Sequence, residues 1–552
     1  MPSTRSRAAT PEISLSRLSR LLRALALCSL ALGALPACDG VLGDGPAGPI
    51  GSPDGPDPRA PTDVRIETRV WRLSPMQFDD EVARLLGPGA PDVVIPASAG
   101  EDGLTNIAAN ARVDLGNASI YVDGTRSIGT WAAAQGGAVS RCTDHGTDAC
   151  IDSFLAWFPE SAYRRPVSAE EIAELRSLFD DLRAAYDYDY AFSGLVRAVL
   201  LSPEFLYRTE LGDDADVGTT TLTGGEISNL LAFAITDESP DDELRTLARS
   251  GGLEDPDVRE AQARRLMSRS ERMWQRFFWE WLHMATLDSQ GAEVGLEPAM
   301  IEQMEEEYRS FVREIVVVER GTLRSLLSAP YTWTQPELAA LYGAEHSGTG
   351  LARVELDPLQ RGGLLTQGAW LVSHGKRGRD NVVRRGMNIF VDAMCNNITV
   401  PADLDVDAEL ARLVGADATV REVVEARGTT GTCAGCHHLA DPVGLVFESY
   451  ASTGAWQTVY PDGNAVDTAI ELEGLGSFDE APSFSVALAD DHRFQHCFVR
   501  RLTHFMSGID LGAPARVDWT LDAHTRFVES DTSLEELLVA IVRHPAFIER
   551  RK

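Results

Sequence analysis

Two cysteines and a histidine in the segment TGTCAGCHH have the clearest chemical meaning in this sequence. Thiols three positions apart can each add to one vinyl group of a haem, and a histidine directly after the second thiol can bind the iron. With 8 Cys and 11 His in 552 residues, such a pattern would arise by chance in about one chain in 400. Cys433, Cys436 and His437 therefore predict one covalently bound haem c, with His437 as the proximal iron ligand.

Two other uses of the same residues stay open. A zinc ion could be held by Cys433, Cys436, His437 or His438 and a distant cysteine. Cys433 and Cys436 could also form only a disulfide. The sequence favours haem over both, because of the placement of the histidine and because the chain carries an export signal.

The N-terminal segment 1–37 has the pattern of a signal peptide. Arginines precede the apolar run LLRALALCSLALGALPA, which is too short and unsuitably flanked for a membrane span. The run ends in LPAC, similar to a bacterial lipoprotein cleavage box, so we expect Cys38 to be the lipidated first residue of the mature chain. This predicts a periplasmic or cell-surface protein anchored to a membrane, without indicating which membrane.

The next segment, 38–61, predicts a flexible linker. Residues 39–61 hold six Gly, six Pro and four Asp, a composition that cannot bury a core. The formal net charge of −33 argues against nucleic acid as a partner, because phosphates require Lys and Arg. The acidity suits a cationic redox partner, although an ordinary solvated surface explains it equally simply.

Beyond the linker, the hydrophobic pattern is mostly helical. In SAEEIAELRSLFDDLRAAYD, Ser168 and Glu171 form a capping box ahead of apolar residues at helical spacing. Aromatic residues in ERMWQRFFWEWLHM also follow helical spacing, which predicts core packing and not a cofactor platform. Strand signals are few. The sequence therefore predicts a mainly α fold of multi-helical domains with a C-terminal cytochrome-c-like module.

Several segments, in the same order, resemble a known group of proteins. They include VWRLSPMQFDDEVARLLG, FLAWFPESAYRRPVSAEE, LVRAVLLSPEFLYRTELG, APYTWTQPELAALYG, TTGTCAGCHHLADPVGLVFESYASTGAWQ and HCFVRRLTHFMSGIDLG. The chain resembles the large exported proteins of planctomycetes and myxobacteria that join several domains of unknown function to a planctomycete-type cytochrome-c-like (PSCyt) module. The resemblance implies a mostly helical, exported protein with haem on Cys433, Cys436 and His437, and it supplies no reaction.

We divide the chain accordingly. After the signal peptide and linker we expect an N-terminal family domain (62–140), a helical domain (141–190), a helical middle domain (191–350), the cytochrome-c-like domain (351–480) and a C-terminal helical domain (481–552).

The sequence does not determine which residue, if any, occupies the second axial position of the iron. Met506 is a candidate sixth ligand that would raise the reduction potential and suit electron transfer. Its competitors are His374, His492, His496 and His504, and a second histidine would imply a lower potential. An empty position would favour peroxide or small-ligand chemistry.

Two neighbouring segments could contact the haem. HGKRGRDNVVRRGMN supplies Lys376, Arg377, Arg379, Arg384 and Arg385, which could bind the propionates or a carboxylate substrate; salt bridges within the protein are the favoured interpretation. In DPVGLVFESY, Pro442 and Gly444 would permit a tight chain path, and Leu445, Val446 and Phe447 would cover the haem edge.

The remaining cysteines predict two disulfides. Cys142 and Cys150 are close enough in sequence for a local bridge, and Cys395 and Cys497 flank the haem segment and could join the two C-terminal parts.

Two function classes follow. The first is a lipid-anchored c-type haem protein with an electron-transfer or other haem-dependent redox role and an unidentified redox partner. The second is a surface-anchored protein that binds a polymer such as a polysaccharide, with the haem module as an accessory. We find no serine-hydrolase order, metalloprotease helix or nucleotide fingerprint, so the sequence assigns no enzyme class.

Overall fold

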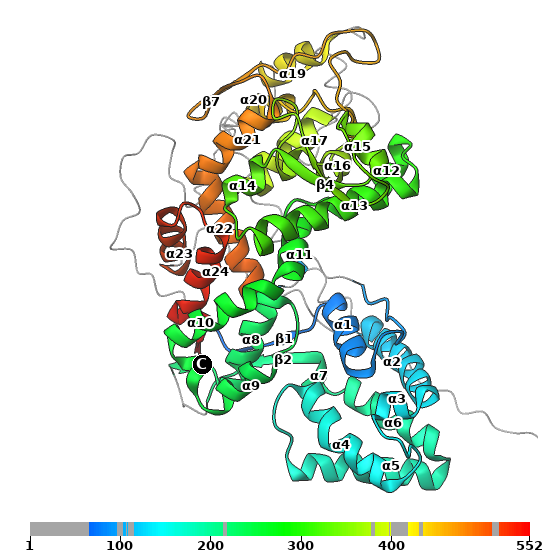
Figure 1. The fold of residues 1–552 in the computed structure, drawn as a ribbon. Coiled ribbons are helices and arrows are strands. Elements are labelled where there is room, and N and C mark those ends of the chain that lie inside the picture. The colour runs from blue at the N-terminus through cyan, green and yellow to red at the C-terminus, as the bar shows by residue number, and fades with distance from the viewer. Residues whose placement is uncertain are drawn as a thin grey trace, which may run out of the picture. The chain divides into compact units, whose positions relative to one another are not determined.

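The computed structural model describes residues 66–96, 103–105, 107–108, 115–213, 218–376, 381–396, 398, 418–429, 434–509 and 518–552. The predicted signal peptide (1–37), Cys38 and the predicted linker lie outside the described residues, as do Cys433, Arg377 and Arg379. The fold is mainly α, as the hydrophobic pattern predicts (Figure 1). None of the helices in the described part of the chain is long and apolar enough to cross a membrane.

The N-terminal helices pack around a hydrophobic core of their own, formed by residues between Phe78 and Leu206. They are α1 (Pro75–Leu86), α2 (Leu115–Gln135), α3 (Gly137–Ser140), α4 (Asp148–Tyr163), α5 (Ala169–Ala185), α6 (Tyr188–Leu200) and α7 (Pro203–Leu206). α5 begins at the predicted capping box, in which Ser168 and Glu171 each accept a backbone N–H of the other. This cap satisfies amide groups that the first helical turn leaves without partners.

A larger core joins the remaining helices. The first group is α8 (Gly224–Thr236), α9 (Asp242–Arg249), α10 (Pro256–Leu266), α11 (Glu271–Trp281), α12 (Leu287–Val294), α13 (Pro298–Arg313), α14 (Leu323–Ser328) and α15 (Pro336–Tyr342). The second group is α16 (Gly368–Ser373), α17 (Asn381–Met387), α19 (Val420–Thr429), α20 (Ala434–Leu445), α21 (Ala481–Asp490), α22 (His492–Ser507), α23 (Asp518–Glu529) and α24 (Leu534–Arg543). Because one core extends from α8 to α24, the middle and C-terminal regions stabilise each other.

Short helical turns connect these elements. Turns of 3-10 type lie at Gly252–Glu254, Met267–Arg269, Met284–Thr286, Leu364–Thr366 and Pro545–Phe547, and π-helical turns lie at Glu314–Val318 and Asn388–Ala393.

The described strands form four antiparallel pairs. They are β1 (Arg69–Arg72) with β2 (Tyr207–Glu210), β3 (Thr219–Thr221) with β8 (Glu549–Arg551), β4 (Tyr331–Thr334) with β5 (Ala352–Glu355), and β6 (Ile470–Leu472) with β7 (Gly476–Phe478). In the register, Trp71 faces Arg208 and Thr220 faces Arg550. The pair β3–β8 brings the C-terminal end of the chain back to the start of the larger core.

The aromatic residues of α11 lie in this core, as their helical spacing predicts. Trp274, Phe277, Phe278 and Trp281 are buried. Each contacts Phe498 of α22, with ring centroids 5.4–6.5 Å apart. These contacts fasten α11 to α22, so the aromatic cluster is structural.

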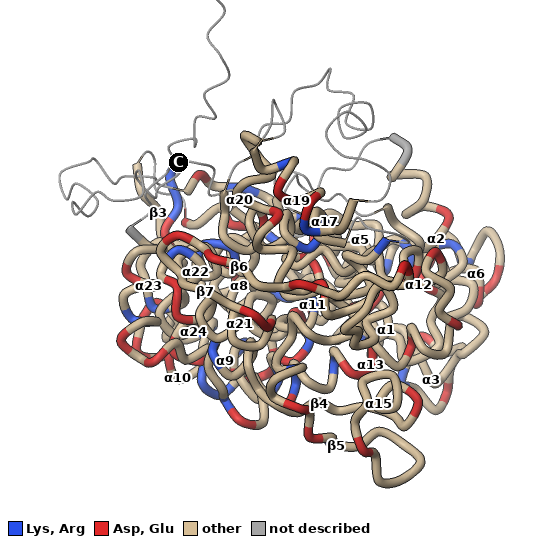
Figure 2. The backbone as a smooth tube through the Cα atoms, turned by 90° about the horizontal axis from the view of Figure 1, so that it is seen from above, with Lys and Arg blue, Asp and Glu red and all other residues tan. Residues whose placement is uncertain are grey.

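Charged residues of both signs are distributed over the described elements (Figure 2). Many of the acidic groups are paired with arginine: Arg264, for example, lies within 3.1 Å of carboxylate oxygens of Glu260, Glu535 and Glu536. Exposed pairs of this kind contribute little stability individually. The pairing accords with the interpretation of the acidic composition as a solvated surface.

Candidate functional site

The candidate site lies at the start of α20, which carries Cys436 and His437 in its first turn. α20 packs against α17 and α19. α19 begins where Thr419 and Glu422 hydrogen bond to each other's backbone N–H, at 2.8 and 3.3 Å, which is the geometry of a capping box. Cys436 and His437 are therefore presented by a helix that two other helices hold in place.

Two glycines allow α17 and α20 to approach at backbone contact. A Cβ atom on Gly444 would lie 1.8 Å from the carbonyl oxygen of Val382, and one on Gly386 would lie 2.1 Å from that of Ala440. No other residue fits these positions without displacing a helix. The sequence assigned Gly444 and Pro442 to a tight loop around haem, and this was wrong: both lie within α20, where Gly444 serves helix packing.

His437 is oriented by a carboxylate one turn further along α20. Its Nδ1 lies 2.9 Å from Oδ1 of Asp441. Arg427 of α19 places its Nε 3.0 Å from Oδ2 of the same carboxylate. Asp441 is fully buried and Arg427 nearly so, whereas the imidazole of His437 keeps a fifth of its surface exposed.

This arrangement fits a metal-binding imidazole. A carboxylate can only accept, so Nδ1 of His437 must carry the proton and Nε2 keeps the lone pair that a metal needs. Imidazoles that bind metals usually donate their other N–H to a carboxylate or carbonyl in this way. Cys436, in the same turn, is partly exposed, and the side chain of the exposed His438 contacts the backbone carbonyl of Ala434.

Asp441 was missed in the sequence because DPVG has the composition of a turn. The signal that could have identified it is the spacing of four between His437 and Asp441, which places both side chains on one face of a helix. Arg427 has no comparable signal, since it belongs to a different helix.

The apolar residues expected to cover a haem edge lie inside the protein. Leu445, Val446 and Phe447 are buried. The ring of Phe447 lies 4.9 Å from Trp370 and 5.9 Å from Phe484. These side chains belong to the core of the protein, and their contact with a haem edge stays a prediction.

The described arginines of the basic stretch bind backbone carbonyls and an amide, and neither makes the expected salt bridge with an acidic residue that the structure describes. Fully buried Arg385 donates to the carbonyls of Phe447 and Tyr450 at 2.9 and 2.8 Å. Arg384 donates to the carbonyl of Gly375 at 2.9 Å and also to Gln290. Burial lowers the pKa of Arg385 to about 10. Arg385 thus holds the segment that follows α20 through its carbonyl groups.

The structure does not bring Met506 to His437. Met506 is buried in the core near the C-terminal end of α22. That end lies against β1, where Arg69 donates to the carbonyl of Gly508 at 3.0 Å, whereas His437 lies on α20 against α17 and α19.

The histidines that compete with Met506 as sixth ligand lie in different environments. Nδ1 of buried His374 lies 2.9 Å from the carbonyl of Trp370. The rings of His496 and His524 lie 5.5 Å apart, His504 is buried in α22, and His492 is exposed at the start of that helix. Burial lowers the pKa of both His374 and His496 to about 4.

Both predicted disulfides are present in the structure. Cys142 is joined to Cys150, and Cys395 is joined to Cys497. The second bridge removes both distant cysteines that the zinc alternative required. Among the described residues, no group of three or more His, Cys, Asp and Glu side chains could hold a metal ion.

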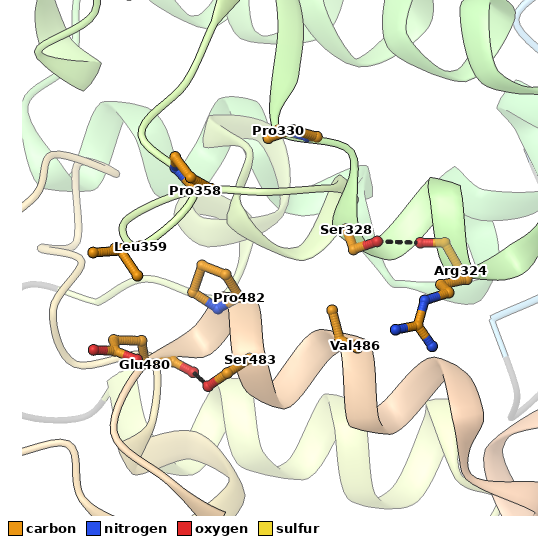
Figure 3. Close-up of a pocket in the computed structure, with 9 residues that line it drawn as sticks. All are labelled: Arg324, Ser328, Pro330, Pro358, Leu359, Glu480, Pro482, Ser483 and Val486. Atoms are coloured by element: carbon orange, nitrogen blue, oxygen red, sulfur yellow. Dashed lines mark hydrogen bonds between the residues drawn. The ribbon is translucent and has the colours of Figure 1, made fainter.

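A surface hollow of about 300 Å³ lies between the loop after α14 and the start of α21 (Figure 3). Pro330, Pro358, Leu359, Pro482 and Val486 supply most of its apolar lining. The hydroxyls of Ser328 and Ser483 are hydrogen bonded to nearby carbonyls of their own segments. The hollow offers little polar chemistry.

Three family models match the chain. They are PSD5, a protein of unknown function (DUF1595), over residues 150–210; PSD4, a protein of unknown function (DUF1592), over 222–344; and PSCyt3, a protein of unknown function (DUF1588), over 361–460. The last range includes α17, α19 and α20 with the candidate site. Neither a curated protein nor a solved structure matches the chain.

Proposed function

Because the chain is a multi-domain protein of planctomycete-type domains of unknown function with a PSCyt module, we propose that it is an exported c-type haem protein that transfers electrons. The observation that carries the proposal is the geometry of His437, whose Nδ1 faces Asp441 so that Nε2 is available to iron. Cys433 and Cys436 would attach one haem c, and the bound group would supply one-electron chemistry. The name of the PSCyt3 model and the two disulfides, typical of proteins matured outside the cytoplasm, support the proposal.

Covalent haem attachment is the first prediction to test. The full chain would be expressed in a bacterial periplasm with a c-type maturation system and measured by visible spectrum and pyridine haemochrome. We expect one covalent haem per chain, lost in Cys433→Ala and in Cys436→Ala. The matched control is Cys142→Ala with Cys150→Ala, which removes two disulfide-bonded cysteines and keeps the motif. A protein without covalent haem that holds zinc, or only a disulfide at these cysteines, would refute the proposal.

The sixth position can be resolved on the same protein. Carbon monoxide added to the reduced protein should leave the spectrum unchanged if a side chain fills that position. A large spectral change would instead assign an open site and peroxide or small-ligand chemistry. Met506→Ala should not alter the result, because Met506 lies in α22 and away from His437.

We also propose that lipid on Cys38 anchors the protein to a bacterial membrane, with the haem facing an unidentified redox protein. Cys38→Ala should move the protein from the membrane fraction to the soluble periplasmic or extracellular fraction without changing its haem content.

One observation favours the second function, binding of a polymer at the cell surface. Tyr186, at the C-terminal end of α5, and Tyr190, in the first turn of α6, are 63% and 48% exposed, with ring centroids 4.1 Å apart. Exposed aromatic rings beside Asp187 and Asp189 could stack on sugar rings. Co-sedimentation with insoluble polysaccharides, lost in Tyr186→Ala with Tyr190→Ala but kept in Cys436→Ala, would favour this function over electron transfer.

A further inference from the structure

The side chains of His437, Asp441 and Arg427 contact one another in that order. His437 contacts Asp441 within α20, and Asp441 contacts Arg427 across the interface with α19. Asp441 has no exposed surface, and a buried carboxylate is costly unless it is paired and hydrogen bonded. Oδ1 is hydrogen bonded to His437, and Oδ2 is paired with the guanidinium of Arg427 in a contact without hydrogen-bond geometry.

We propose that Asp441 is a positioning residue that holds His437 in the Nδ1–H tautomer and lowers the reduction potential of the site, and that Arg427 limits this effect. The inference rests on the proposed function, because it concerns the iron that His437 would bind. The inference also goes beyond that function, because it names the groups that set the reduction potential.

The physical argument concerns electron density on the imidazole. A carboxylate that accepts the Nδ1 proton increases the basicity of the ring and therefore its donation through Nε2. The oxidised iron carries one more positive charge than the reduced iron, so stronger donation and a nearby anion stabilise it more. The positive charge of Arg427, next to the other carboxylate oxygen, offsets part of the negative charge of Asp441. Transfer of one electron between the iron and a redox partner forms and breaks no bond.

The potential is measured by equilibrating the haem-loaded full chain with a one-electron redox dye. We expect Asp441→Asn to favour the reduced state at least tenfold, which corresponds to about 59 mV for a one-electron couple. Adding Arg427→Met to this variant removes the buried cation that has lost its partner, so the double variant should lie between Asp441→Asn and the wild type. The double variant also keeps the test valid if an unpaired Arg427 prevents the single variant from folding.

Glu425→Gln is the matched control. Glu425 is exposed on α19, two positions before Arg427, and its substitution changes the charge by the same amount without touching Asp441. It should shift the dye equilibrium far less than tenfold. Equal shifts in Glu425→Gln and Asp441→Asn would reduce the effect to general charge and overturn the proposal.

A second measurement uses no haem. In haem-free full chain with labelled histidine, the nitrogen chemical shifts of His437 should report the Nδ1–H tautomer. Asp441→Ala should produce a mixture of tautomers. An unchanged tautomer in Asp441→Ala would refute the positioning role.

Different results would refute the proposed function and the role of Asp441. Wild-type protein that attaches no haem would refute the proposed function and this inference with it. Attached haem with unchanged potentials in the Asp441 variants would refute only the role of Asp441.

Discussion

At the scale of single residues, a buried carboxylate organises the polar interior between α13 and α16. Glu307 of α13 is fully buried and accepts hydrogen bonds of 2.8 Å from Thr332 and 2.6 Å from Tyr342. The hydroxyl of Tyr342 in turn accepts the N–H of Gly368, the first residue of α16. Burial raises the pKa of Glu307 to about 7. Glu307 therefore couples the region matched by PSD4 to that matched by PSCyt3.

The raised pKa predicts a pH-dependent stability that Glu307→Gln removes. The folded protein keeps this proton to about pH 7, whereas the unfolded chain releases it near 4.5. The contribution of neutral Glu307 is therefore complete below pH 4.5 and is lost as the pH rises through 7, by at most about 3 kcal/mol. Urea unfolding from pH 5 to 8 should show this loss in the wild type and a smaller loss in Glu307→Gln.

Other buried groups provide the control for that measurement. Burial also raises the pKa of Glu448 to about 7. The effect of His374 on stability has the opposite pH dependence. Because its pKa is lowered in the folded protein, stability is lost as the pH falls below 6.5. Both remain in Glu307→Gln, so the difference from the wild type isolates Glu307. Parallel pH profiles for the two proteins would contradict the prediction.

At the scale of elements, the contact between α17 and α20 holds the candidate site. Its geometry depends on Gly386 and Gly444, where the helices meet without intervening side chains. A helix normally loses stability at glycine compared with alanine, so glycine here is explained by close approach and not by helix propensity.

Gly444→Ala should therefore destabilise the haem-free protein by about 2 kcal/mol or more, because its Cβ atom would overlap the carbonyl of Val382. Gly435→Ala is the control within the same helix. Gly435 is exposed and has open space where a Cβ atom would lie, so alanine should be neutral or stabilise by about 0.5–1 kcal/mol. Thermal unfolding of both variants would test this. Similar effects of the two substitutions would show that α17 and α20 are not in close contact.

At the scale of the whole molecule, contacts between distant parts of the chain join regions that carry family matches to segments outside those matches. The bridge between Cys395 and Cys497 spans 102 residues and links the segment after α17 to α22. Glu210, at the end of β2, pairs with Arg69 at 2.9 Å and accepts a hydrogen bond from Arg550 at 2.6 Å, which ties both ends of the described chain together. The C-terminal helices therefore belong to the framework that supports α20.

Removing the long bridge should cost more than removing the short one. In the chain-entropy account, a loop of about 100 residues contributes roughly 4–5 kcal/mol, and a loop of eight residues about 2–3 kcal/mol. Cys395→Ala with Cys497→Ala should thus lower the free energy of unfolding by about 2 kcal/mol more than Cys142→Ala with Cys150→Ala. Chemical denaturation of the two double variants checks this order. A reversed order would mean that the N-terminal core depends on its bridge more than the larger core does.

Local patterns in the sequence were sufficient for several features. The capping box at Ser168 and the core role of the aromatic residues of α11 follow from helical periodicity, which depends on neighbours within one or two turns. The mainly α class follows for the same reason. The spacing of Cys433, Cys436 and His437 is also a local pattern, and the haem that it predicts stays a prediction.

The surroundings of that motif were decided by tertiary structure. DPVG has the composition of a turn, yet Pro442 and Gly444 lie in α20 because backbone contact with α17 favours the helix there. Arg385 was assigned a salt bridge or an external ligand, but it binds carbonyls that only the folded chain places around it. The pairing of Asp441 with Arg427 joins two helices and has no periodicity of its own. Sequence by itself therefore determined which residues could do chemistry and which segments were helical; their partners depend on long-range packing, which local patterns do not encode.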